Sequence, residues 1–286
     1  MGMKIWLNDK LVDESEAKVS VFDHGLLYGD GVFEGIRVYN RKVFELETHI
    51  QRLYESAHAI RLTIPQDKEA LSQNVRTTVQ ANDISDGYIR LVVTRGVGTL
   101  GLNPMACKKP QIIIIAATIQ LYPQELYETG LKVVSANTMR NHPLAVSPQI
   151  KSLNYLNNIL AKLEALDRDM LEAIMYNHMG FVAEGTGDNV FMVKENQIFT
   201  PPHSAGSLTG ITQKVVIQLA RQSGYEVIER NITRYDLYEA DEIFLTGTAA
   251  EVIGVVDLDG RTIGSGRPGP VTRELLKKFE AFVRSQ

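Results

Sequence analysis

One lysine of this sequence stands where its side chain could do chemistry. Lys151 lies in the segment 148–155, between an irregular approach and a strongly apolar stretch whose helix Ser152 could cap. A lysine amine in a partly buried site loses its proton readily and can become a Schiff-base nucleophile, whereas a surface lysine stays charged. Taken alone, the position is more typical of a lysine whose stem packs at a helix start. Its role therefore depends on the residues that accompany it.

Three further segments of the second half carry groups that suit a phosphorylated cofactor. Segment 181–191 puts the carboxylate of Glu184 at a strand end, followed by small residues. Segment 208–212 opens a helix, where Gly210 permits close backbone approach and the N–H groups that follow form an anion site. Segment 246–251 repeats this after a strand, with hydroxyl and N–H groups in a turn. A lysine, a carboxylate and two such turns are the components of a pyridoxal phosphate site.

With these segments the chain resembles the class IV, or fold type IV, pyridoxal phosphate aminotransferases, and most closely the branched-chain amino acid aminotransferases. The resemblance runs over residues 5–279. One position departs from the family pattern, because Gln213 stands where the family usually has Lys or Arg. We expect Gln213 to tune the helix start without abolishing cofactor binding. The most specific motif combines Glu184 with residues 189–191, 198–200 and 208–211.

The resemblance implies a role for each cofactor-binding position. Lys151 would hold the cofactor as a Schiff base and move the proton between the substrate α-carbon and the cofactor. Glu184 would face the pyridine nitrogen and keep it protonated. Tyr155 would donate a hydrogen bond to the phenolate oxygen, and Arg52 would bind the phosphate. The remaining cofactor-binding residues would be Leu208, Gly210, Ile211, Thr212 and Thr248.

The resemblance also implies a substrate site. Segment 28–37 is similar to the branched-chain signature, in which Phe33 and Gly35 line an apolar pocket and a tyrosine, here Tyr28, reaches the site from a neighbouring subunit. Tyr88 would help to hold the α-carboxylate, and Arg90 would receive the second carboxylate of glutamate. An apolar pocket with a retractable arginine at its rim suits both kinds of side chain. The full predicted set is Tyr28, Phe33, Gly35, Arg37, Tyr88, Arg90, Thr248 and Ala249.

The implied reaction is reversible transfer of the amino group of L-leucine, L-isoleucine or L-valine to 2-oxoglutarate, in two alternating half-reactions. D-amino acid aminotransferases share the scaffold but carry an Arg-x-His pair where this chain has Arg95 followed by Gly96 and Val97. Aminodeoxychorismate lyases use the same lysine, and segment 33–37 weighs against that activity. A catalytically silent binding protein would be expected to have lost Lys151, which is present.

Composition limits the classes of protein that this chain can be. Of its 286 residues, 44% are hydrophobic and 22% charged, which is typical of a folded protein of about two domains. The formal net charge of −4 argues against a nucleic-acid partner, and no apolar stretch suits a signal peptide or a membrane span. A single cysteine excludes an internal disulfide, and the histidines lack metal-ligand spacing. We expect a cytoplasmic protein without metal that acts on amino and 2-oxo acids as a homodimer or larger oligomer, each site completed by the neighbouring subunit.

Hydrophobic patterning predicts the elements that must position these residues. The order of strands and helices lacks a strict alternation, so it predicts an α+β fold rather than a doubly wound sheet. We expect a smaller N-terminal domain over 1–119, a linker over 120–130, and a larger C-terminal α/β domain over 131–286 that carries the cofactor lysine. The predicted strands are 4–7, 18–22, 32–39, 42–44, 88–95, 111–119, 131–136, 172–177, 189–193 and 241–246, and the predicted helices are 49–62, 67–82, 153–167, 211–223 and 271–284.

Overall fold

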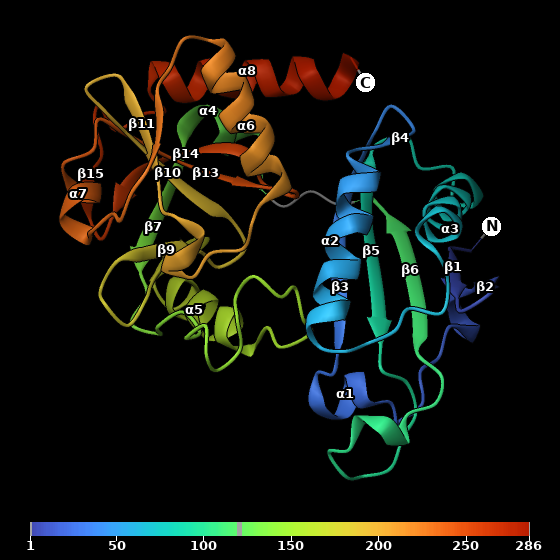
Figure 1. Ribbon diagram of the computed structural model, residues 1–286. Coiled ribbons are helices and arrows are strands. Elements are labelled where there is room, and N and C mark those ends of the chain that lie inside the picture. The colour runs from blue at the N-terminus through green and yellow to red at the C-terminus, as the bar shows by residue number, and fades with distance from the viewer. Residues whose placement is uncertain (1, 119–121, 286) are drawn as a thin grey trace. The chain divides into compact units, whose positions relative to one another are not determined.

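The computed structural model describes residues 2–118 and 122–285 and divides the chain into two compact units (Figure 1). The first unit contains residues 1–119 together with Ile150–Asn154, and the second contains residues 120–149 together with Tyr155–Ser285. The predicted linker at 120–130 begins outside the described residues, and its later part contains a short helix, α4 (Glu125–Thr129). No helix among the described residues is long and apolar enough to cross a membrane.

The first unit is a six-stranded antiparallel sheet in the order β2-β1-β6-β5-β3-β4, with α2 and α3 packed against it (Figure 1). Alternate positions of β3, β5 and β6 point to these helices, because successive side chains of a strand face opposite sides. The elements are β1 (Lys4–Leu7), β2 (Lys10–Asp13), a 3-10 turn (Glu14–Glu16), α1 (His24–Tyr28), β3 (Gly31–Tyr39), β4 (Lys42–Val43), α2 (Leu46–Ala59), α3 (Lys68–Ala81), β5 (Gly87–Thr94), a 3-10 turn (Pro104–Ala106) and β6 (Gln111–Ala117).

The second unit is a nine-stranded mixed sheet in the order β12-β11-β10-β13-β14-β7-β8-β9, with β15 beside β14. Helices α6 and α8 pack on β13 and β14, and α5 packs on β7 and β8 (Figure 1). The elements are β7 (Leu131–Ser135), α5 (Leu156–Leu166), β8 (Glu172–Tyr176), β9 (Val182–Gly185), β10 (Asn189–Lys194), β11 (Gln197–Thr200), a 3-10 turn (His203–Ala205), α6 (Ile211–Gln222), β12 (Val227–Glu229), α7 (Arg234–Tyr238), β13 (Glu242–Gly247), β14 (Glu251–Leu258), β15 (Arg261–Thr262) and α8 (Pro270–Ser285).

The predicted strand at 18–22 is wrong. Residues 17–20 have no regular structure, and Val21 and Phe22 are 68% and 48% exposed, because no described strand pairs with this stretch. The helix predicted from 49 begins earlier, at Leu46. The hydroxyl of Thr48, in the first turn of this helix, donates to the carboxylate of Glu45 at 2.7 Å.

Helix α5 differs from its prediction at its start, and its apolar stripe is not the face that it buries. It begins at Leu156 rather than 153, and no side chain caps it. Its buried residues are the small ones, Asn158, Ala161 and Ala165, which let the helix approach β7 and β8 closely. The apolar stripe at helical spacing is exposed, at 46–66%, and consists of Leu156, Ile159, Leu160, Leu163 and Leu166.

The segment 150–154 belongs by its contacts to the first unit, although the sequence placed it in the C-terminal domain. Ser152 forms an isolated β-bridge with Val32 at the edge of β3. The N–H of Leu153 donates to the Gly31 carbonyl at 2.9 Å. Backbone pairing with β3 therefore places these five residues in the first unit, although the residues on both sides of them in the sequence belong to the second.

Candidate active site

Strands β3 and β5 present five predicted substrate residues on one face of the first unit's sheet. Gly35 lies opposite Arg90 and Arg37 opposite Tyr88, and residues directly opposite each other share a face. Phe33, two positions before Gly35, lies on this face as well. A Cβ on Gly35 would lie 1.9 Å from the Tyr88 hydroxyl oxygen, so only glycine leaves room for that ring.

Arg90 is held over an aromatic surface on this face. Its guanidinium carbon lies 4.6 Å from the centroid of the Phe33 ring and 5.4 Å from that of Tyr88. Such stacking favours a cation while keeping its polar edge available for a ligand. The face therefore combines an apolar surface with a positive charge.

Lys151 is attached to the same strand. Its carbonyl oxygen accepts a hydrogen bond from the Phe33 N–H at 3.0 Å, and its own N–H donates to the Ser56 hydroxyl at 3.2 Å. The Lys151 Nζ lies 4.7 Å from the Phe33 ring centroid. The structure thus brings the predicted reactive amine beside the predicted substrate face.

Arg52 is anchored on the other face of β3. Both carboxylate oxygens of Glu34 accept hydrogen bonds from its guanidinium, from Nε at 2.7 Å and from Nη2 at 2.8 Å. His49 adds a third contact to the same carboxylate through Nδ1 at 2.7 Å. Burial alone would raise the pKa of Glu34, but the charge of Arg52 and the hydrogen bonds from Arg52 and His49 lower it to about 2. Sequence reasoning assigned no role to Glu34 or His49, although both lie inside the motifs that identified their neighbours.

Tyr28 lies at the end of α1, and its contacts are with residues other than these groups. Its hydroxyl donates to the Leu100 carbonyl in the loop before β6, and its ring packs edge-on against His24 with centroids 5.0 Å apart. The hydrogen bond to Leu100 joins α1 to the loop that precedes β6, whereas the ring contact lies within α1.

In the second unit, Glu184 sits at the end of β9 with both carboxylate oxygens engaged. Arg140 donates from Nε to one oxygen at 2.7 Å, and the Leu208 N–H donates to the other at 2.9 Å. Arg140 and Glu184 are both buried. Each carboxylate oxygen has two lone-pair sites, so further acceptor capacity remains. No motif in the sequence pointed to Arg140.

The N-terminus of α6 is organised by hydrogen bonds to neighbouring strands. The first helical bond runs from the Lys214 N–H to the Gly210 carbonyl, so the N–H groups before Lys214 have no partner within the helix. Asn189 donates to the Leu208 carbonyl at 2.9 Å and fixes the approach to the helix. Gln213, buried, accepts from the Gly210 N–H at 3.3 Å and donates to the Thr200 hydroxyl at 3.3 Å.

The remaining predicted residues of this unit lie in a turn and directly before a helix. Thr248 and Ala249 lie half-buried in the turn between β13 and β14, and Tyr155 lies immediately before α5. The Thr246 hydroxyl, just before the first turn, is buried without a hydrogen-bonding partner among the described residues. Buried hydroxyls are normally paired, so this atom is suited to a ligand or a water at the turn.

These groups fit a phosphorylated pyridine aldehyde by their chemistry. Lys151 offers an amine, Glu184 a buried carboxylate, Arg52 a guanidinium, and α6 a helix N-terminus for an anion. The first unit holds Lys151, Arg52 and the substrate face, and the second holds the remaining groups.

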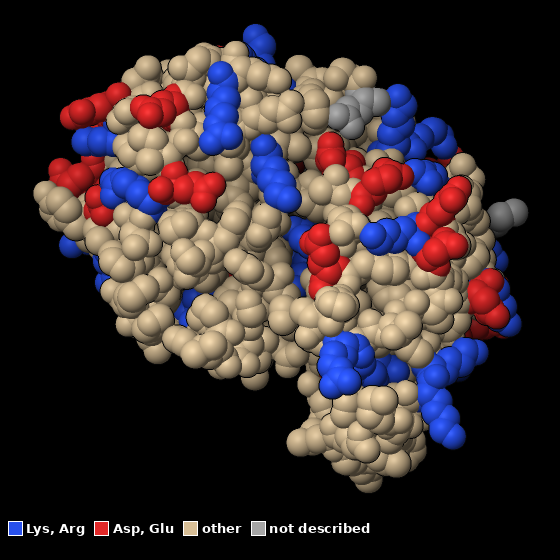
Figure 2. All heavy atoms as spheres, in the orientation of Figure 1, with Lys and Arg blue, Asp and Glu red and all other residues tan. Residues whose placement is uncertain are grey.

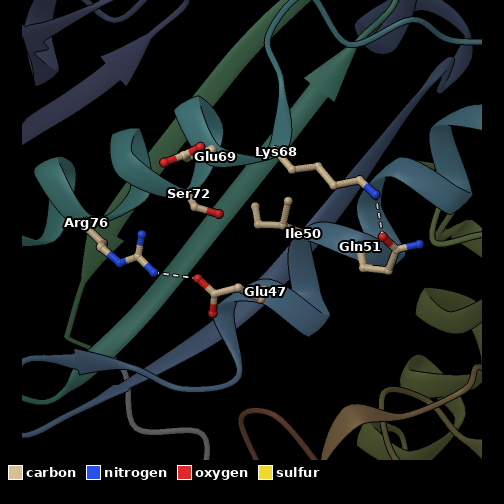
Figure 3. Close-up of a pocket in the computed structure, with 7 residues that line it drawn as sticks. All are labelled: Glu47, Ile50, Gln51, Lys68, Glu69, Ser72 and Arg76. Carbon is tan, nitrogen blue, oxygen red and sulfur yellow. Dashed lines mark hydrogen bonds and ion pairs between the residues drawn. The ribbon is translucent and has the colours of Figure 1, made fainter.

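A separate cavity of about 460 Å³ lies between α2 and α3 (Figure 3). Arg76 pairs with Glu47 across it, and Lys68 donates to Gln51. It contains none of the predicted site residues, being lined by Glu47, Ile50, Gln51, Lys68, Glu69, Ser72 and Arg76.

The α+β fold and these groups define a class IV aminotransferase, and the chain belongs to that family, whose model matches residues 31–258. The chain is 51% identical over 278 residues to a Methanocaldococcus jannaschii protein assigned by name to the branched-chain-amino-acid aminotransferases, covering 97% of this chain and 96% of that one. A D-alanine aminotransferase of Bacillus licheniformis is 37% identical, covering 99% and 98%. The solved branched-chain amino acid aminotransferase of T.th. with pyridoxamine 5'-phosphate has a TM-score of 0.96 at 36% identity, covering 100% and 95%.

Proposed function

We propose that this protein is a branched-chain amino acid aminotransferase that transfers the amino group of L-leucine, L-isoleucine or L-valine reversibly to 2-oxoglutarate. The observation that carries the proposal is the face of β3 and β5, where Phe33 and Gly35 border the stacked Arg90. The apolar surface suits an aliphatic side chain, and the arginine suits the second carboxylate of glutamate. The Methanocaldococcus jannaschii protein and the solved structure described above are both named as branched-chain amino acid aminotransferases.

Pyridoxal 5'-phosphate is the proposed cofactor, and it would supply an electron sink for the substrate α-carbon. Lys151 would hold it covalently and move the proton at that carbon. Glu184 would keep the ring nitrogen protonated, and Arg140 and the Leu208 N–H hold one oxygen each of that carboxylate. Arg52 and the first-turn N–H groups of α6 would bind the phosphate, and Tyr155 would donate to the phenolate oxygen.

The roles of the remaining predicted residues follow from the same assignment. Thr248 and Ala249 would hold the substrate α-carboxylate through turn N–H groups, with the Tyr88 hydroxyl as a further donor. Gln213 lies in the first turn of α6, at a position where relatives usually have Lys or Arg. Because its amide bonds two neighbouring groups, the helix start keeps its geometry without that charge.

We further propose that the protein works as a homodimer or larger oligomer and that Tyr28 reaches a site of the neighbouring subunit. Two exposed apolar surfaces support this assembly. One is the α5 stripe of Leu156, Ile159, Leu160, Leu163 and Leu166. The other is the end of the first unit that carries α1, where Figure 2 shows uncharged side chains on this face; its exposed residues include Leu26, Leu100, Leu102 and Met105. The cytoplasmic location stays a prediction.

The test follows the visible absorption of the protein after pyridoxal 5'-phosphate has been supplied. L-Leucine should remove the yellow band, and 2-oxoglutarate should restore it. D-Alanine in a parallel cuvette should leave the band unchanged. Bleaching by D-alanine alone would replace the proposal with a D-amino acid aminotransferase, and absence of any band would favour a silent binding protein.

A further inference from the structure

The Arg52 guanidinium is held more rigidly than anion binding alone requires. Nε and Nη2 donate side by side to the two oxygens of Glu34, at 2.7 and 2.8 Å, which fixes the plane of the guanidinium. The Glu34 side chain has no exposed surface, and that of Arg52 is 11% exposed. A bidentate pair in this setting leaves the arginine one orientation.

His49 completes the arrangement from the same helix. Its ring is fully buried, and Nδ1 lies 2.7 Å from Oε2 of Glu34. Burial lowers the pKa of His49 despite the opposing effect of Glu34, so the ring is neutral and its single proton lies on Nδ1, facing the carboxylate. The other nitrogen, Nε2, has no hydrogen-bonding partner among the described residues. The carboxylate thus receives three N–H donors, one of them uncharged.

Such an arrangement is a poor device for stability. Desolvation of a buried ion pair offsets most of its attraction, and apolar residues of similar volume often do as well. The partly neutralised charge of Arg52 also attracts an anion less strongly than an unpaired guanidinium would. A function that needs direction rather than maximal charge accounts for both features.

We propose that Glu34 and His49 are positioning residues, which fix the guanidinium of Arg52 in the orientation that binds the phosphate group of the cofactor. The inference rests on the proposed function, since it assumes that Arg52 binds this phosphate. Glu34 sets the plane of the guanidinium, and His49 sets the rotamer of Glu34. Neither residue needs to touch the cofactor.

The chain offers a matched control in the same unit. The two carboxylate oxygens of Asp30 accept hydrogen bonds from Nε and Nη2 of Arg95, at 3.0 and 2.9 Å. This is the same bidentate geometry as that of Glu34 with Arg52. Arg95 also donates to the carbonyls of Ile60 and Arg61, so this pair ties backbone segments together. Loss of Asp30 reports what loss of a carboxylate–arginine pair does to the unit in general.

The experiment titrates the cofactor-free protein with pyridoxal 5'-phosphate and, separately, with pyridoxal, which lacks the phosphate. In Glu34→Gln one oxygen becomes an N–H donor facing other donors, so the Kd for pyridoxal 5'-phosphate should rise about tenfold or more. His49→Leu should act in the same direction. His49→Asn, which can place an amide N–H near the position of Nδ1, should restore most of the affinity. The Kd for pyridoxal should stay within about twofold in all three.

Several results would overturn the inference. Equal weakening of both ligands in Glu34→Gln, matched by Asp30→Asn, would make the pair structural only. An unchanged Kd for pyridoxal 5'-phosphate in His49→Leu would remove His49 from the role, and this series decides the matter if Glu34→Gln does not fold. If the unaltered protein binds no pyridoxal 5'-phosphate, the proposed function itself fails, and the inference fails with it.

Discussion

At the scale of single residues, the site depends on small groups that make room for large ones. Gly35 is the sharpest case, because any side chain there meets the Tyr88 ring. Lys151 shows a different dependence. Its place beside Phe33 comes from backbone hydrogen bonds rather than from its own side chain. The chemistry and the scaffold of these residues can therefore be separated by substitution.

Gly35→Ala should raise the KM for amino-acid substrates about tenfold and lower stability by about 1–3 kcal/mol. The new Cβ would lie 1.9 Å from the Tyr88 hydroxyl oxygen and 2.7 Å from Cζ, so the ring must move. Steady-state kinetics and thermal unfolding measure the two effects. Gly101→Ala is the control, because the nearest atom to its Cβ is Thr99 Oγ1 at 3.8 Å. Wild-type kinetics in Gly35→Ala would contradict the assigned substrate face.

Lys151→Ala should lower kcat by about a thousandfold or more, since it removes the amine that moves the proton. The backbone bonds of residue 151 to Phe33 and Ser56 do not involve the side chain, so the melting temperature should hardly change. Turnover of L-leucine and a melting curve check both statements. Lys68→Ala, on the cavity between α2 and α3, should keep wild-type turnover.

At the scale of elements, β8, β9 and the turn before β10 bring two carboxylates together. A carboxylate oxygen of Glu172 accepts from the Thr186 N–H at 2.7 Å. The Tyr122 hydroxyl donates to one oxygen of Glu172 and to one of Asp188, each at 3.5 Å. Burial and the charge of Glu172 raise the pKa of Asp188 to about 7. The turn that follows Glu184 therefore contains a buried acid whose pKa is raised by its surroundings.

Asp188→Asn should remove a pH dependence of stability. Between about pH 4 and 7 the folded protein keeps a proton on Asp188 that the unfolded chain releases, so the wild type loses stability as pH rises through this range. The isosteric amide has no proton to lose, so the variant should gain a few kcal/mol over the wild type between pH 4 and 8. Urea unfolding at several pH values measures this. A constant difference between the two proteins would contradict the prediction.

The elements also show what the sequence could and could not specify. Runs of apolar, often β-branched residues predicted β3, β5 and β6 as strands. The nearly continuous apolar runs suggested that β5 and β6 are buried on both faces, whereas burial in the structure mostly alternates along them. The same composition at 18–22 misled, since a strand also needs a partner. The α5 stripe has helical spacing, yet periodicity does not say which face is buried. Motif spacing identified Glu184 and the start of α6, whereas Arg140 comes from a distant segment and carries no local pattern.

At the scale of the whole molecule, the proposed assembly would bury the exposed α5 stripe between subunits. Leu160→Glu combined with Leu163→Glu should lower the mass measured by light scattering, because an unpaired charge is costly to bury in an interface. Leu144→Glu, at a residue 92% exposed and outside the stripe, should leave the mass unchanged. An unaltered mass in the double variant would place the contact between subunits elsewhere.

The attachment of segment 150–154 to β3 has a consequence for how such genes can recombine. A crossover near residue 120 would join foreign residues 1–119 to a native segment 150–154, which still needs the edge of β3. Backbone pairing tolerates many sequences, but the ring of Phe33 and the hydroxyl of Ser56 beside Lys151 must come from the foreign parent. Chimaeras are thus constrained at positions far from the breakpoint. Each unit has its own core, but a functional chimaera has to match segment 150–154 to its neighbours in the first unit.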